Sequence, residues 1–148
     1  MVMLKKVKEI MTKDVEYCTL LDNVFEVAVK MKDLDVGAIP IVNDEQHLVG
    51  MITDRDIVIR GVAEKHPGST KVEDIMSDKL ITIEPETSVE EAIQLMKKHQ
   101  VRRLPVVENK NLIGILALGD VALQSSFDHQ AEEALTEISE DHHSTYLQ

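Results

Sequence analysis

The sequence is poor in cysteine, in aromatic residues and in long apolar runs, and each shortage excludes a class of protein. A single cysteine, Cys18, cannot form a disulfide within the chain, which favours a reducing compartment. Tryptophan is absent and aromatic residues make up 3%, so a core has to be built from Val, Ile, Leu and Met. No segment approaches the roughly 20 apolar residues that cross a bilayer, and the opening MVMLKKVKEIM lacks the apolar run of a signal peptide. We therefore expect a cytoplasmic protein with no membrane contact.

Positive charge is also scarce. The chain carries 16 basic and 27 acidic residues, which gives a formal net charge of −11. A negative field repels phosphodiester backbones, so we expect no nucleic-acid partner. The 148 residues are 43% apolar, which is enough for one compact domain or for two small repeats that share a core.

The chain repeats itself. A shift of 65 positions lays VKEIMTKDV (7–15) over VEDIMSDKL (72–80), and residues 24–36 and 38–42 over 89–101 and 103–107. After one residue is dropped, LVGMITDRDI (48–57) lies over LIGILALGDV (112–121). Self-similarity at a fixed period indicates one structural unit that is used twice.

Each copy predicts the same elements. Apolar residues recur at helical spacing after residues 23 and 88, and Asn23 with Glu26 and Ser88 with Glu91 have the pattern of capping boxes. Two short apolar runs separated by a polar turn follow in each copy, as expected for a buried hairpin, and a further helix follows Asp56 or Asp120. The predicted order is strand, helix, strand, strand, helix, twice over, an α/β fold.

The predicted boundaries are a first repeat at 5–64, a linker at 65–71, a second repeat at 72–125 and an acidic helix or tail at 126–148. In this last segment the apolar residues would line one face of a short helix that packs on the core or on a partner chain; they are Ala131, Ala134, Leu135 and Ile138. His142 and His143 lack companion ligands at metal-site spacing, so we interpret them as a solvated terminus and expect no metal site.

The doubled pattern V-x-x-I-M, capped helix, h-P-V-V and h-h-G-h-h-T-x-x-D, with h an apolar residue, resembles a tandem pair of CBS domains, the regulatory module of cystathionine β-synthase. The likeness covers roughly residues 5 to 123, and the chain is similar to small stand-alone bacterial CBS proteins. It implies two β-α-β-β-α repeats packed about a pseudo-twofold axis, with two clefts between them and dimerisation into a disc. It also implies binding of adenosine compounds such as AMP, ADP, ATP or S-adenosylmethionine.

Two interpretations compete for Thr53 and Asp56, and they are not exclusive. In the first they form a capping box, with a value of about 1 kcal/mol for the cap. In the second, which the family pattern favours, Asp56 binds both ribose hydroxyls and Thr53 faces a phosphate. The second copy has Ala117 in place of the threonine but keeps Asp120, and a carboxylate without its capping partner is better explained by ribose.

All four arginines lie in candidate segments: Arg55, Arg60, Arg102 and Arg103. Arginine binds phosphate bidentately, and the resemblance implies this role for Arg102 and Arg103 just before the second h-P-V strand. Gly37 and Ala38 replace them in the first copy. Alternatively, the arginines pair with nearby acids such as Asp54, Glu108 or Asp120.

A purine base needs an apolar slot, for which residues beside the prolines, such as Ile39 and Pro40, are candidates. Their side chains are expected in the core, so their backbone at the rim is the candidate contact. Thr19 is included because family members often contact base or sugar at its position, although its counterpart in the second copy is Glu84.

The sequence offers no motif for catalysis: no Walker-type glycine loop, no GxGxxG and no paired-cysteine metal motif. We therefore expect a ligand-sensing regulatory module rather than an enzyme, with no obligatory cofactor, that acts as a homodimer on a separate effector protein. The alternative is a structural dimerisation scaffold whose clefts are empty.

Overall fold

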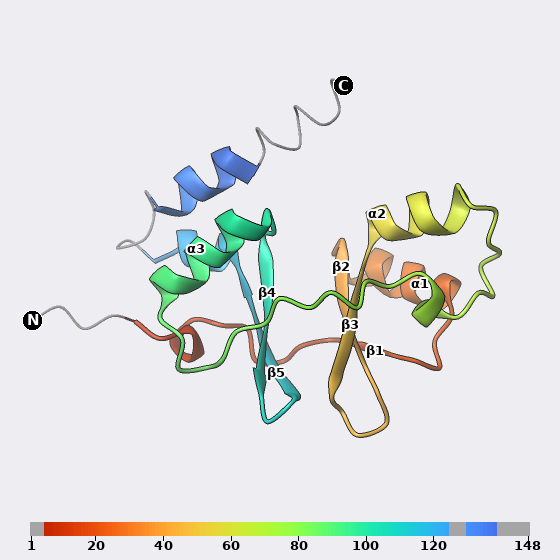
Figure 1. Cartoon of the computed structure of the whole chain (residues 1–148), viewed down its shortest axis with the longest axis horizontal. Helices are drawn as coiled ribbons and strands as arrows, with labels where there is room; N and C mark the ends of the chain where they lie inside the picture. The colour runs from red at the N-terminus through yellow and green to blue at the C-terminus, as the bar shows by residue number, and fades with distance from the viewer. Residues whose placement is uncertain (1–4, 125–129, 139–148) are drawn as a thin grey trace, which may run out of the picture. The chain divides into compact units, whose positions relative to one another are not determined.

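The computed structural model describes residues 5–124 and 130–138 and is a mixed α/β protein (Figure 1). The chain divides into two compact units. Unit 1 contains residues 5–15 and 81–108 and the described residues from 113 onward, and unit 2 contains residues 16–80 and 109–112. The fold class expected from the sequence is confirmed.

Unit 2 is built on a three-stranded sheet in the order β1-β2-β3. The short β1 (Cys18–Thr19) is parallel to β2 (Ala38–Val42), which forms the predicted antiparallel hairpin with β3 (Leu48–Thr53). The helices α1 (Val24–Leu34), α2 (Asp54–Asp56) and the π-helical η2 (Ile57–Val62) lie on one side of this sheet (Figure 1). The core is aliphatic, as the composition predicts, and contains Val27, Ile39, Ile41 and Ile52.

Unit 1 has the same plan with a shorter sheet. The hairpin of β4 (Arg103–Glu108) and β5 (Asn111–Ala117) is preceded by α3 (Val89–His99) and followed by α4 (Leu118–Ala122). The first strand of the second repeat is reduced to one parallel bridge between Ile83 and Val106. Its core is again aliphatic and contains Ile93, Met96, Leu104 and Leu116.

Each V-x-x-I-M segment completes a unit that is built mainly from the other repeat. Val72 of the 3-10 helix η3 (Val72–Asp74) lies in the core of unit 2, whereas Val7 of the 3-10 helix η1 (Val7–Glu9) lies in the core of unit 1. Backbone bonds join Ser77 to Met51 in unit 2 and Thr12 to Ile115 in unit 1. The compact units therefore do not coincide with the repeats of the sequence.

The two long helices begin as the sequence predicts, with one difference. At α1 the Asn23 side chain accepts from the Glu26 N–H at 2.8 Å, and the Glu26 carboxylate accepts from the Asn23 N–H, so the capping box is complete. At α3 the Ser88 hydroxyl accepts from the Glu91 N–H at 3.2 Å, but the predicted reciprocal bond does not form. In both helices the first helical N–H donates to a distant carbonyl, Val24 to Thr70 and Val89 to Lys5.

A helix over residues 130–138 covers the core of unit 1 and lies beside α3 (Figure 1). Ala131, Ala134 and Ile138 are at most 2% exposed, and Lys97 of α3 pairs with two acidic side chains of this helix, Glu133 and Glu137. Packing of the acidic segment on the core is thus confirmed for these three residues, whereas Leu135, which was expected on the same face, is 43% exposed. Residues 126–129 and 139–148, with His142 and His143, lie outside the described part of the chain.

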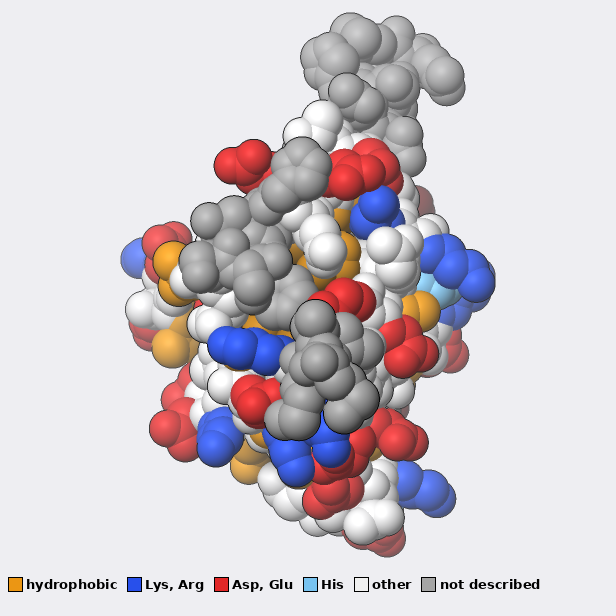
Figure 2. Space-filling model, turned by 90° about the vertical axis from the view of Figure 1, so that its left-hand side faces the viewer, with side chains coloured by type: hydrophobic (Ala, Val, Ile, Leu, Met, Phe, Trp, Pro, Cys, Tyr) orange, Lys and Arg blue, Asp and Glu red, His pale blue; other side chains and the backbone are white. Residues whose placement is uncertain are grey.

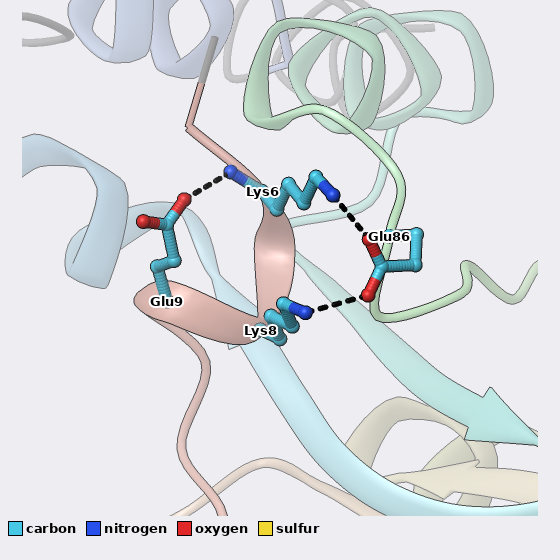
Figure 3. A network of polar contacts seen from close by, with 4 residues as sticks. All are labelled: Lys6, Lys8, Glu9 and Glu86. Atoms are coloured by element: carbon cyan, nitrogen blue, oxygen red, sulfur yellow. Dashed lines mark hydrogen bonds and ion pairs between the residues drawn. The ribbon is translucent and has the colours of Figure 1, made fainter. Parts of the chain in front are cut away.

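A polar network ties η1 to the segment before α3 (Figure 3). The ammonium groups of Lys6 and Lys8 each bind one oxygen of the Glu86 carboxylate, the latter at 2.6 Å, and the Lys6 N–H donates to Glu9. Hydrogen bonds from the two lysines lower the pKa of Glu86 to about 2. Together with backbone bonds from Val7 and Lys8 to residues 85 and 87, this network holds the N-terminal segment in unit 1.

Candidate functional site

The junction between β3 and α2 places Thr53 and Asp56 together in unit 2. Thr53 ends β3 opposite Ala38 of β2. Its hydroxyl accepts from the Asp56 N–H at 3.0 Å, and its own N–H donates to Oδ2 of Asp56 at 2.9 Å. The capping-box interpretation is therefore confirmed, and it fixes the half-buried Asp56 carboxylate at the start of the helix.

The same junction brings the Asp54 carboxylate close to Gly37, the residue of the first copy that corresponds to Arg102. The Asp54 N–H donates to the Gly37 carbonyl at 2.9 Å, and a Cβ on Gly37 would lie 3.1 Å from Oδ2 of Asp54. A side chain at residue 37 would crowd that carboxylate. In unit 1 the equivalent bond runs from the Leu118 N–H to the Arg102 carbonyl at 2.8 Å, and there the longer side chain is accommodated.

The remaining candidates of unit 2 lie at different places. Arg55 is exposed on α2, and its N–H donates to Oδ1 of Asp54 at 2.8 Å. The side chain of Ile39 is in the core and Pro40 is buried, as expected of β2 residues. Thr19 pairs with Val42, at the opposite end of β2 from Ala38 and Thr53. The five residues of β2 span about 13 Å, so the fold does not bring Thr19 to the junction.

Thr19 instead forms a turn before α1. Its N–H donates to the Asp22 carboxylate at 2.7 Å, and its hydroxyl accepts from the Leu21 N–H at 3.3 Å. These bonds give Thr19 a structural role in leading the chain from β1 into α1. Its contact with a ligand stays a prediction.

The second junction, in unit 1, is arranged differently. Ala117 precedes α4 and offers no side chain to cap it, so Asp120 has no capping partner there. Oδ2 of Asp120 instead lies 3.4 Å from the hydroxyl of Thr12, which reaches it from the N-terminal segment. Sequence reasoning missed Thr12. The alignment of the repeats places Thr12 over Ser77, so both copies have a hydroxyl at this position, but the alignment does not indicate a contact with Asp120.

Arg102 belongs to this second junction through its backbone, and Arg103 follows it as the first residue of β4. Both side chains are exposed. Among the described residues no ion pair links either arginine to an acidic side chain, so the alternative that they serve as salt-bridge partners gains no support. The junction of unit 1 thus combines a carboxylate and a hydroxyl, with two exposed arginines beside it in the chain.

The single cysteine is not a nucleophile at neutral pH. Cys18 is 3% exposed, and burial, with a smaller contribution from Asp22, raises the pKa of its thiol to about 11. The thiolate is the reactive form, so this side chain behaves as a small core residue. Among residues 5–124 and 130–138 no group of three or more potential ligand side chains is placed to hold a metal ion.

On the face seen in Figure 2, acidic and basic side chains are interspersed, so this face is neither uniformly acidic nor uniformly basic. In the part of the chain that is described, no helix has both the length and the apolar character needed to cross a membrane.

These features define a family. Two copies of the CBS domain model match residues 7–61 and 72–125, and the chain belongs to the CBS domain family. It is similar to the uncharacterized protein YlbB of Bacillus subtilis, with 52% identity over 136 residues that cover 91% of this chain and 92% of YlbB. It is also similar to the CBS domain-containing protein YhcV of the same organism, with 44% identity and coverage of 92% and 96%.

Solved structures share the fold. Hypoxic Response Protein I, crystallised with two coordinated zinc ions, superposes with a TM-score of 0.76 and 32% identity, covering 81% of this chain and 98% of its own. CBSX2 in complex with AMP has a TM-score of 0.71 and 25% identity, with coverage of 84% and 98%. The likeness to both supports a pair of CBS repeats as the main architecture, to which the helix over residues 130–138 is added.

Proposed function

We propose that the chain is a regulatory module without catalytic activity that binds an adenosine nucleotide such as AMP, ADP or ATP at its strand–helix junctions. The observation that carries the proposal is that each unit presents an aspartate at the third helical position, Asp56 or Asp120, directly after the hairpin. The complex of CBSX2 with AMP supports an adenosine ligand for a protein of this fold.

The carboxylates are suited to ribose. An ionised carboxylate is an acceptor only, and its two oxygens can accept from the two hydroxyls of a ribose at once. Asp56 already has one oxygen bonded to the Thr53 N–H, which fixes the direction of the other. A sugar that binds there replaces water. Because the carboxylate is already oriented, binding does not have to order that side chain further.

The arginines are suited to phosphate. Arg102 and Arg103 are exposed at the junction of unit 1, and Arg55 is exposed beside Asp56 in unit 2. On a chain with a net charge of −11, a guanidinium fork is the group that can attract and orient a phosphate. For the base we propose contacts with the backbone of Ile39 and Pro40, while Thr19 is the least supported contact. That the ligand bridges the two repeats stays a prediction from the resemblance.

Binding becomes a signal only if the ligand favours one conformation or assembly over another. We propose that the chain acts in the cytoplasm as a homodimer and passes this change to a separate effector protein. Large apolar side chains exposed on α1 and η2 of unit 2 support association, among them Phe25, Val58 and Val62. The competing function is a dimerisation scaffold that binds no nucleotide.

The test is a thermal-shift panel of AMP, ADP, ATP, NAD, S-adenosylmethionine and guanine nucleotides, followed by calorimetric titration of the best ligand. At 100 times Kd a ligand adds about 2.7 kcal/mol of stability, which raises Tm by several degrees for a chain of this size. Asp56→Asn keeps an oxygen for the Thr53 N–H but removes the charge. We expect it to weaken binding at that junction about 10-fold to 100-fold.

Asp44→Asn is the matched control, because it makes the same change on an exposed residue in the turn between β2 and β3, away from Thr53. It should leave the ligand response unchanged. A wild-type protein that responds to no member of the panel would favour the scaffold, and turnover of a nucleotide would show an enzyme.

A further inference from the structure

The two junctions hold their aspartates by different means. In unit 2, Asp56 bonds to the residue that ends the preceding strand, Thr53, within the same turn of chain. In unit 1 the equivalent residue is Ala117, which has no hydroxyl. The hydroxyl near Asp120 comes from Thr12, 108 residues away in the sequence.

Thr12 is held firmly where it meets the junction. Its N–H donates to the Ile115 carbonyl at 2.9 Å, and its carbonyl accepts from the Ile115 N–H at 3.0 Å. The segment also packs tightly on β5, since a Cβ on Gly114 would lie 3.0 Å from the Thr12 carbonyl oxygen. The position of the Thr12 hydroxyl is therefore set by the backbone pairing and not by a flexible tail.

The corresponding residue of unit 2 has another role. Ser77 makes the same backbone pair, with Met51, but its hydroxyl accepts from the Lys79 N–H at 3.3 Å. Asp56 is held by Thr53 instead. In unit 2 the Thr53 hydroxyl accepts from the backbone N–H of Asp56, and the Thr53 N–H donates to the Asp56 carboxylate. In unit 1 the Thr12 hydroxyl itself lies beside the Asp120 carboxylate.

We propose that Thr12 is a positioning residue for the ligand site of unit 1, where its hydroxyl donates to the Asp120 carboxylate and orients it toward the ribose. This inference rests on the proposed function. At 3.4 Å the contact is longer than a usual O–H···O hydrogen bond, and we expect it to shorten when a sugar fixes the carboxylate. By linkage, a ligand held by Asp120 then stabilises the pairing of the N-terminal segment with β5.

The test uses the full chain with Asp56→Asn, so that binding reports on unit 1, and measures AMP affinity by calorimetry. In this background Thr12→Val, which has nearly the same shape but no hydroxyl, should weaken binding about threefold to tenfold. Thr12→Ser should restore it, because serine returns the hydroxyl. The preference for AMP over 2′-deoxy-AMP should shrink in Thr12→Val and return in Thr12→Ser, which a purely structural role of Thr12 would not produce.

Hydrogen exchange supplies a second readout. AMP should slow exchange of the amides of residue 12 and Ile115 in the protein with Thr12, and should do so less with Thr12→Val. Equal affinity and equal sugar preference of Thr12→Val and its parent would overturn the inference and leave the proposed function intact. If Asp56→Asn alone abolished AMP binding, the inference about Thr12 would be overturned and the proposed function would stand. A wild-type protein that binds no nucleotide would overturn the inference and the proposed function together.

Discussion

At the scale of single residues, two glycines show how closely the V-x-x-I-M segments pack. A Cβ on Gly50 would lie 2.5 Å from the sulfur of Met76, and one on Gly114 would lie 2.5 Å from the sulfur of Met11. Neither glycine has a positive φ, so the reason for glycine is space and not backbone conformation. The sequence shows these glycines as identical between the repeats, but only the packing shows what each one contacts.

We expect Gly114→Ala to destabilise unit 1 by about 1–3 kcal/mol, because the methyl group displaces the Met11 side chain and crowds the Thr12 carbonyl. Gly119→Ala is the matched control. It lies in α4, where the added methyl group would meet nothing within 4 Å, and helix propensity predicts a gain of up to about 1 kcal/mol. Urea unfolding of the two variants measures both values, and an unchanged midpoint for Gly114→Ala would contradict the close packing.

At the scale of elements, the helix caps and the hairpins follow from local sequence, and their prediction was accurate. Asn23 and Thr53 cap as expected, since the groups that bond lie three residues apart and need no distant partner. The cap at Ser88 is only half formed: its hydroxyl accepts from the Glu91 N–H, but Glu91 does not bond back to the Ser88 N–H. The first helical N–H of each long helix donates to a distant carbonyl, Val24 to Thr70 and Val89 to Lys5, and no local rule predicts these two bonds.

The network of Lys6, Lys8 and Glu86 predicts a pH dependence for this segment (Figure 3). The pKa of Glu86 is lowered to about 2 by the lysine hydrogen bonds. Its stabilising effect is therefore fully present above the ordinary glutamate pKa of about 4.3, and it is lost as the pH falls toward 2. Because all three side chains are about half exposed, the effect is small and is screened by salt.

Glu86→Gln should accordingly lower the urea midpoint at pH 7, and the difference from the wild type should close as the pH approaches 2. Glu84→Gln, an exposed carboxylate two residues earlier with no ion pair to any of the described residues, is the control and should show no such closing. A difference that is independent of pH would mean that the carboxylate charge of Glu86 does not act on folding.

At the scale of the whole molecule, the proposed homodimer has a defined test. Phe25 on α1 is 64% exposed and Val62 on η2 is 68% exposed, on two elements that pack against each other in unit 2. Phe25→Asp and Val62→Asp should each convert a dimer to a monomer in light scattering coupled to size exclusion, because an unpaired charge is costly to bury in an interface. Leu123→Asp, at an 82% exposed residue of unit 1, is the control and should remain dimeric.

The sequence by itself determined the family, the repeated order of elements and the positions of the two aspartates, because each depends on spacing within a few residues. Only the tertiary structure decided which V-x-x-I-M segment completes which unit. The two segments are alike, and a motif that fits either copy carries no information about its distant partner. For the same reason the pairing of Thr12 with Asp120 emerged only from the fold: a contact across 108 residues is set by the packing of Val7 and Met11, not by any local rule.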